Sequence, residues 1–164
     1  MVNFKAYQGT ITSISDLITG QNDIGAGCYK LLSADNGSGS IVNFVASPAT
    51  YFVDHAMVAV GDKVTGYYDA NAPAPLIFPP QFQALVMAKF NPLQNVKVDY
   101  FNSQLESSDG QLKLNLSPFT QIVLTNGQAF SNNPANRNLI AIYGPSTKSI
   151  PAQTTPYKIV VLCF

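Results

Sequence analysis

The chain carries one order of motifs twice within its 164 residues. Ser-Pro-Ala-Thr at 47–50 recurs as Ser-Pro-Phe-Thr at 117–120, and Pro-Pro-Gln at 79–81 recurs as Pro-Ala-Gln at 151–153. The interval from Thr50 to Pro79 is 29 positions and that from Thr120 to Pro151 is 31, so the spacing recurs as well. A tandem duplication explains this order, and it predicts two similar structural units.

Short strands separated by turns are the local pattern. Residues 112–116 and 96–100 alternate apolar and polar side chains, as half-buried strands do. Glycine-rich turns such as 35–39 and 109–110 separate such runs. We therefore expect an all-β fold made of two small OB-like Greek-key barrels, at 1–91 and 92–164; a pair of small β-sandwiches is the alternative.

The charge composition restricts the classes of partner. Charged residues make up 11% of the chain, and nine basic and nine acidic residues cancel. A net charge near zero weakens repulsion between copies and favours self-association. Arg137 is the only arginine and the lysines are scattered, which argues against nucleic-acid binding. No apolar run approaches the roughly 20 residues of a membrane-spanning helix, so no span is expected.

Two proline-rich segments, 69–81 and 144–153, occupy equivalent places in the repeats. Proline fixes φ, so these segments should be extended and stiff. Their apolar residues Leu76, Ile77, Phe78 and Ile150 are unfavourable in water. Two interpretations stay open: a loop that folds back over the end of a barrel, or an arm that docks onto a neighbouring subunit or ligand.

Residues for catalysis or metal binding are sparse. His55 is the only histidine, and its neighbour Asp54 would point to the opposite face of an extended segment. The two cysteines, Cys28 and Cys163, lie far apart in sequence, whereas a transition-metal site needs clustered ligands. We expect no catalytic residue, cofactor or metal, and therefore no enzyme. The cysteines are open to three states: reduced, bridged to each other, or paired between molecules through Cys163.

One segment resembles a known group of proteins. Thr-Lys-Ser-Ile-Pro-Ala-Gln-Thr at 147–154, followed by Lys-Ile-Val-Val-Leu at 158–162, is similar to a short β repeat in uncharacterised proteins of Gram-positive spore-forming bacteria. That repeat often stands beside domains labelled copper-amine-oxidase-like at the N-terminus. The similarity covers mainly 96–162, with a weaker echo in 9–88. It implies a bacterial surface or envelope setting and no copper chemistry, because the oxidase's redox cofactor residues have no counterpart.

These observations lead to a first functional hypothesis: a non-enzymatic, self-associating subunit of a bacterial surface, spore or extracellular fibre. Its partners would be copies of itself. No signal peptide is visible at the N-terminus, so a cytoplasmic or mother-cell origin stays open. The uncharged C-terminal run has high β propensity and would recruit another strand if its edge were free. The expected contacts are Leu76, Ile77, Phe78, Ile150, Ile159, Val161 and Cys163.

The second hypothesis is a carbohydrate- or cell-wall-binding module. Tyr67, Tyr68 and Tyr143 lie at equivalent places of the two repeats, and tyrosine rings can stack on sugars. Such residues are also common in cores and interfaces, so the pattern alone does not separate the two roles.

Overall fold

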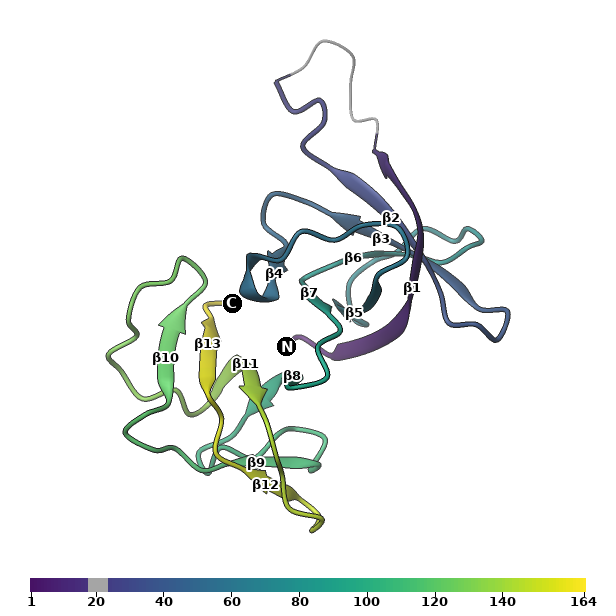
Figure 1. Cartoon of the computed structure of the whole chain (residues 1–164). Coiled ribbons are helices and arrows are strands. Elements are labelled where there is room, and N and C mark those ends of the chain that lie inside the picture. The colour runs from purple at the N-terminus through teal and green to yellow at the C-terminus, as the bar shows by residue number, and fades with distance from the viewer. Residues whose placement is uncertain (18–23) are drawn as a thin grey trace. The chain divides into compact units, whose positions relative to one another are not determined.

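The computed structural model of the chain describes residues 1–17 and 24–164 (Figure 1). The chain is all-β; the helical structure in these residues is one three-residue 3-10 turn, η1 (Val53–His55). It divides into two compact units, unit 1 (Met1–Phe90) and unit 2 (Asn91–Phe164), next to the expected boundary at 91/92.

Unit 1 is built around one long strand, β1 (Phe4–Asp16). The first part of β1 pairs antiparallel with β5 and the second part with β2. The register shifts between Ile11 and Ser13, and such a bulge bends and twists a strand. The order in the sheet is β4-β7-β5-β1-β2-β3-β6. The other strands are β2 (Lys30–Asp35), β3 (Ile41–Ala46), β4 (Tyr51–Phe52), β5 (Lys63–Asp69), β6 (Gln81–Gln83) and β7 (Val86–Lys89).

The stretch 81–89 links the two ends of this sheet. Its first part, β6, pairs parallel with β3, and its second part, β7, pairs antiparallel with β5. The two residues between them stay bonded on both sides, since the Ala84 amide donates to the Val45 carbonyl and the Leu85 amide to the Tyr67 carbonyl. The core beneath these strands includes Ile11, Leu32, Phe44, Val64 and Met87.

Unit 2 repeats these pairings. The antiparallel pair β8–β11 corresponds to β1–β5, and β11–β13 corresponds to β5–β7. The parallel pair β10–β13 corresponds to β4–β7, and β9–β12 to β3–β6. The place of β2 is taken by two isolated bridges, Phe101↔Ser107 and Glu106↔Lys113. The strands are β8 (Asn95–Phe101), β9 (Leu112–Leu114), β10 (Gln121–Leu124), β11 (Arg137–Tyr143), β12 (Ala152–Thr154) and β13 (Lys158–Leu162).

The repeated Ser-Pro-x-Thr turns make the same hydrogen bonds. The Thr50 hydroxyl donates to the Ala84 carbonyl (2.7 Å) and accepts from the Ser47 amide (3.0 Å). The Thr120 hydroxyl donates to the Pro156 carbonyl (2.8 Å) and accepts from the amide that begins its own turn. In each unit the threonine therefore ties the turn to the junction between two strands, β6 and β7 or β12 and β13.

The C-terminal strand differs from the expectation. β13 pairs parallel with β10 on one side and antiparallel with β11 on the other. Ile159 and Val161 lie in the unit 2 core and are essentially inaccessible to solvent. The condition of a free edge is therefore not met within unit 2, and Ile159 and Val161 are not exposed as contacts. Strand propensity alone does not reveal which strands flank a segment. Cys163 follows β13 and is exposed.

The threonine bridges generate a stability prediction. Thr50→Val and Thr120→Val keep the side-chain shape but leave a part-buried carbonyl without its donor, so each should lower the free energy of unfolding by about 1–2 kcal/mol. Chemical denaturation measures the effect. Thr12→Val is the matched control, because that hydroxyl makes a longer bond (3.3 Å) at an exposed site. Equal losses in Thr50→Val and Thr12→Val would contradict the assigned role.

Candidate functional site

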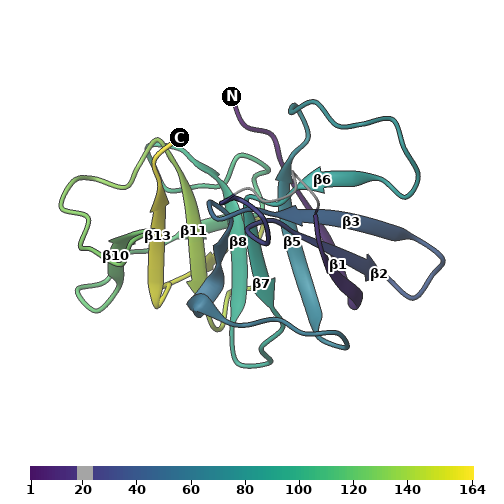
Figure 2. The same ribbon diagram turned by 90° about the horizontal axis from the view of Figure 1, so that it is seen from above.

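The unit 1 arm, residues 70–80 between β5 and β6, is anchored at both ends, and its first part borders a small hollow with Tyr68 and Phe82. At its start, one Asp69 carboxylate oxygen accepts from the Asn71 and Asn3 amides, both at 2.9 Å. At its end, the Pro80 carbonyl accepts from the Asn43 amide (2.8 Å). Between these anchors the arm stands away from the strands of its unit (Figure 2). Four prolines in 73–80 restrict the backbone.

The tip of this arm (Leu76, Ile77 and Phe78) presents apolar side chains to solvent. Leu76 is fully exposed, Phe78 is 85% exposed and Ile77 is 53% exposed. The chain carries no charged residue from 70 to 88, so the tip and its neighbours in sequence are uncharged. Of the two interpretations of this segment, folding back over the end of its own unit does not agree with these exposures. The tip is available to a partner.

The unit 2 arm, residues 144–151, is shorter and more folded on itself. The Thr147 amide donates to the Gln153 carbonyl, and the Gln153 amide donates back to the Thr147 hydroxyl, both at 2.9 Å. The Ser149 hydroxyl donates to the Pro151 carbonyl (2.8 Å). Ile150 is 83% exposed and is the apolar residue that this arm offers.

Unit 1 also carries an open apolar pocket of about 320 Å³. Cys28, a free and exposed thiol, and Lys30 lie at its rim, and the Lys30 ammonium is paired with Asp16. No sequence motif marks this pocket, because its lining comes from several segments that only the fold brings together. The apolar lining consists of Ile14, Leu32, Ala46, Phe52, Ala56, Met57 and Val58.

Strand register places the pocket and the arm at different ends of unit 1. Lys30 pairs with Asp16 on one side and with Ala46 on the other, and this end of the β1-β2-β3 meander holds the pocket. At the far end, β2 and β3 are joined through the pair Asp35↔Ile41. Because β6 runs parallel to β3 from opposite Asn43, the arm reaches the sheet from that far end.

The three tyrosines of the alternative platform hypothesis have different environments within their own units. Tyr67 is 7% exposed, whereas Tyr68 lies half-buried and stacks on Phe82 with ring centroids 4.0 Å apart. Neighbours along a strand point to opposite faces, which explains the difference. Tyr143 packs partly buried against the unit 2 core; burial, then the charge of Asp109, raises its pKa.

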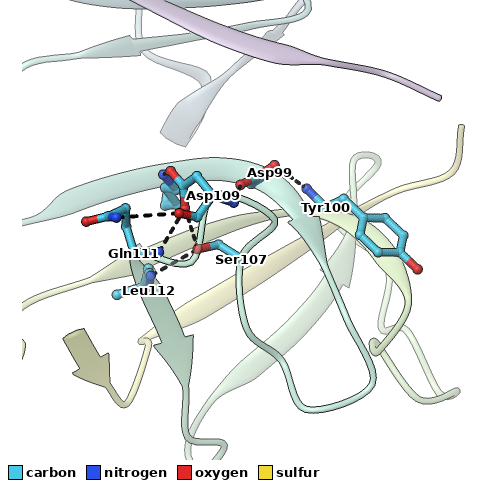
Figure 3. A network of polar contacts seen from close by, with 7 residues as sticks. Asp99, Tyr100, Ser107, Asp109, Gln111 and Leu112 are labelled. Atoms are coloured by element: carbon cyan, nitrogen blue, oxygen red, sulfur yellow. Dashed lines mark hydrogen bonds and ion pairs between the residues drawn. The ribbon is translucent and has the colours of Figure 1, made fainter. Parts of the chain in front are cut away.

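A polar network in unit 2 holds the turn that replaces β2 (Figure 3). One Asp109 carboxylate oxygen accepts from the Ser107 hydroxyl (2.7 Å) and the Gln111 amide (3.0 Å). The other oxygen is paired with Lys97. Asp99 accepts from the Asp109 amide (3.3 Å), which connects the turn to β8.

Ser107 holds the turn through both directions of its hydroxyl hydrogen bonding. The Ser107 hydroxyl donates to a carboxylate and accepts from the Leu112 amide (3.0 Å), so its hydrogen bonds close the turn. The one histidine of the chain, His55, belongs to unit 1, where its ring meets Tyr51 edge to face at 5.7 Å.

Residues 1–17 and 24–164 are the part of the chain that the structure describes. This part of the chain contains no group of three or more His, Cys, Asp or Glu side chains placed to hold a metal ion. No helix in it has the length and apolarity needed to cross a membrane. Comparison with family models, with curated proteins and with solved structures gave no match. The geometry of the arms and the pocket therefore carries the functional argument.

The polar network predicts a pH-dependent stability. Burial raises the pKa of the Asp109 carboxyl. Hydrogen bonds from Lys97, Ser107 and the Gln111 amide, together with the Lys97 charge, lower this pKa by a larger amount, so it lies below its ordinary value of 3.8. A lowered folded-state pKa contributes stability that is present above 3.8 and is lost as the pH falls through the folded-state value.

The difference in unfolding free energy between wild type and Asp109→Asn should therefore shrink between neutral pH and about pH 3. Urea denaturation at several pH values measures it. Asp35→Asn, which removes the turn carboxylate of unit 1 that accepts from the Gly37 amide, controls for losing a turn carboxylate in general. A difference that is constant with pH would show that the Asp109 charge does not stabilise the turn.

Proposed function

We propose that the protein is a non-enzymatic structural subunit that assembles with copies of itself at a bacterial cell or spore surface, or in an extracellular fibre. The observation that carries this proposal is the unit 1 arm tip. Leu76 and Phe78 are exposed apolar residues on a segment anchored at both ends. A stiff, anchored segment loses less conformational freedom on docking than a flexible loop does.

The energetics favour assembly through several contacts. Full burial of an apolar side chain contributes about 1.5–3 kcal/mol, so the three tip residues, of which Ile77 is already half-buried, supply roughly 4–8 kcal/mol. Association of two proteins costs an estimated 4–15 kcal/mol, so one tip alone gives a weak contact. A second contact on the same chain, for which exposed Ile150 is the candidate, would raise the overall affinity through effective concentration.

For each unit we propose an OB-like barrel, in place of the alternative sandwich. The support in unit 1 is the chain of pairings β5–β1–β2–β3–β6, continued through β7 back to β5. A closed arrangement leaves few free strand edges, and contacts between copies would then be made by loops and arms. Unit 2 supports the same proposal through its equivalent pairs.

The proposed setting rests on chemistry and on resemblance. A formal net charge of zero removes long-range repulsion between copies. The similarity of 147–162 to repeats of Gram-positive spore-forming bacteria supports a surface location. Both cysteines are free, and Cys163 is exposed at the end of the chain, so it is available to link copies in an oxidising environment.

Glycan or cell-wall binding is the second candidate function. The stacked pair Tyr68 and Phe82 borders a hollow that also includes Asp69 and Gln83. The hollow is only about 40 Å³. Pockets for small molecules usually measure about 300–1,000 Å³, so this site would hold part of a sugar at most. Self-assembly is therefore the better supported proposal.

The proposal predicts association that depends on the arms. The wild type should show a sedimentation coefficient that rises with protein concentration, and the double variant Ile77→Asp, Ile150→Asp should stay monomeric at the same concentrations. The charge makes burial of either tip unfavourable. Phe119→Asp, at a comparably exposed apolar residue outside the arms, is the matched control and should associate as the wild type does.

If the wild type and the double variant both sediment as the same monomer at high concentration, the assembly proposal fails. Saturable binding of a cell-wall glycan by that monomer would then favour the second candidate function.

A further inference from the structure

We propose that the unit 1 arm tip of one copy inserts into the apolar pocket of unit 1 in a second copy, so that copies join head to tail. This inference rests on the proposed self-association and specifies the surface that each copy contributes. The inserted part is the tip, Leu76, Ile77 and Phe78. The receiving part is the pocket, whose lining includes Ile14, Leu32, Ala46, Phe52, Met57 and Val58.

The two surfaces match in chemistry. The arm is uncharged, and the apolar lining of the pocket would bury the apolar tip side chains. The one charged residue in the lining is Lys30, whose ammonium is paired with Asp16. Insertion of the tip therefore leaves no new unpaired charge in an apolar contact. A pocket of about 320 Å³ is at the small end for ligand sites and suits a few inserted side chains.

The occupant comes from another copy because the arm of the same copy lies elsewhere. The pocket is at the end of the meander marked by Lys30 and Ala46, whereas the arm enters β6 from the end marked by Ile41. Leu76 is fully exposed, so its side chain fills no cavity of its own unit. A second copy provides the same tip without these restrictions.

The contact is heterologous, since the arm tip and the pocket are different surfaces of one unit. A copy that inserts its arm still has an empty pocket, and a copy whose pocket is filled still has a free arm. Such contacts form rings when the rotation between copies closes and open filaments when it does not. Assembly by this contact therefore continues beyond the dimer, until the copies close into a ring or as an open filament.

A mixing experiment tests this arrangement. The arm-blocked variant is Leu76→Asp, Phe78→Asp, and the pocket-blocked variant is Met57→Asp; all three positions are highly exposed, so the fold should tolerate the changes. Each variant alone should lose about tenfold or more in association constant by sedimentation velocity. Mixed in equal amounts they should form a dimer and nothing larger, because the pocket-blocked copy keeps its arm and the arm-blocked copy keeps its pocket.

The outcomes separate this inference from the proposed function. A wild type that stays monomeric overturns both. A wild type that associates while Met57→Asp associates equally well overturns the insertion alone, and points to contact between arms. An equimolar mixture that stays monomeric, although each variant alone has lost association, also overturns the insertion. Circular dichroism of each variant shows that the strands are retained.

A cross-link gives an independent test, because Cys28 is a free thiol in the pocket lining. In the double variant Leu76→Cys, Cys163→Ser, mild oxidation should give an intermolecular disulfide between Cys28 and the introduced cysteine, identified by peptide mass spectrometry. Adding Cys28→Ser should abolish this disulfide and the cross-linked oligomers that it produces. Links only between two introduced cysteines would contradict insertion into the pocket.

Discussion

The fold of each unit depends on one threonine hydroxyl that bridges a turn to the junction between two strands. The Thr50 hydroxyl donates to the Ala84 carbonyl. Ala84 lies between β6, which pairs with β3, and β7, which pairs with β5. Thr120 donates to the Pro156 carbonyl at the corresponding junction of unit 2. A buried carbonyl needs a donor, and the bridge supplies it while fixing the following short strand, β4 or β10, beside β7 or β13. The shared bridge explains why Ser-Pro-x-Thr is the clearest repeat in the sequence.

The two units keep the same pairings and differ in what connects them. Unit 1 has a complete β2 between β1 and β3, a long arm and an open apolar pocket. In unit 2, a turn held by Ser107 and Asp109 stands in place of β2, and the arm is short and bonded to itself. Connections tolerate change better than strands do, because they contribute less to the core. The arm proposed for assembly is a connection of unit 1, whereas the pocket is lined by residues of β1 to β4 together with residues of the connections beside them.

The sequence was sufficient to predict the all-β class, most strands and the equivalence of the two threonine turns, because these depend on local patterns and on the repeat. It could not predict the partners of β13: the flanking strands β10 and β11 are set by distant pairings. The pocket was missed for a similar reason, since its lining comes from separate segments. Strand alternation already separates Tyr67 from Tyr68, because neighbours on one strand face opposite ways.

If an arm tip of one copy fills the pocket of another, methyl NMR of the unmodified chain should detect both surfaces at once. Spectra recorded over a range of concentrations follow the methyl groups of Leu76 and Ile77 on the tip and of Met57 at the pocket. The account predicts that the tip and Met57 signals shift or broaden together as concentration rises, while buried Leu139 in unit 2 stays unchanged. Tip signals that change while Met57 does not, or no change in either, would contradict it.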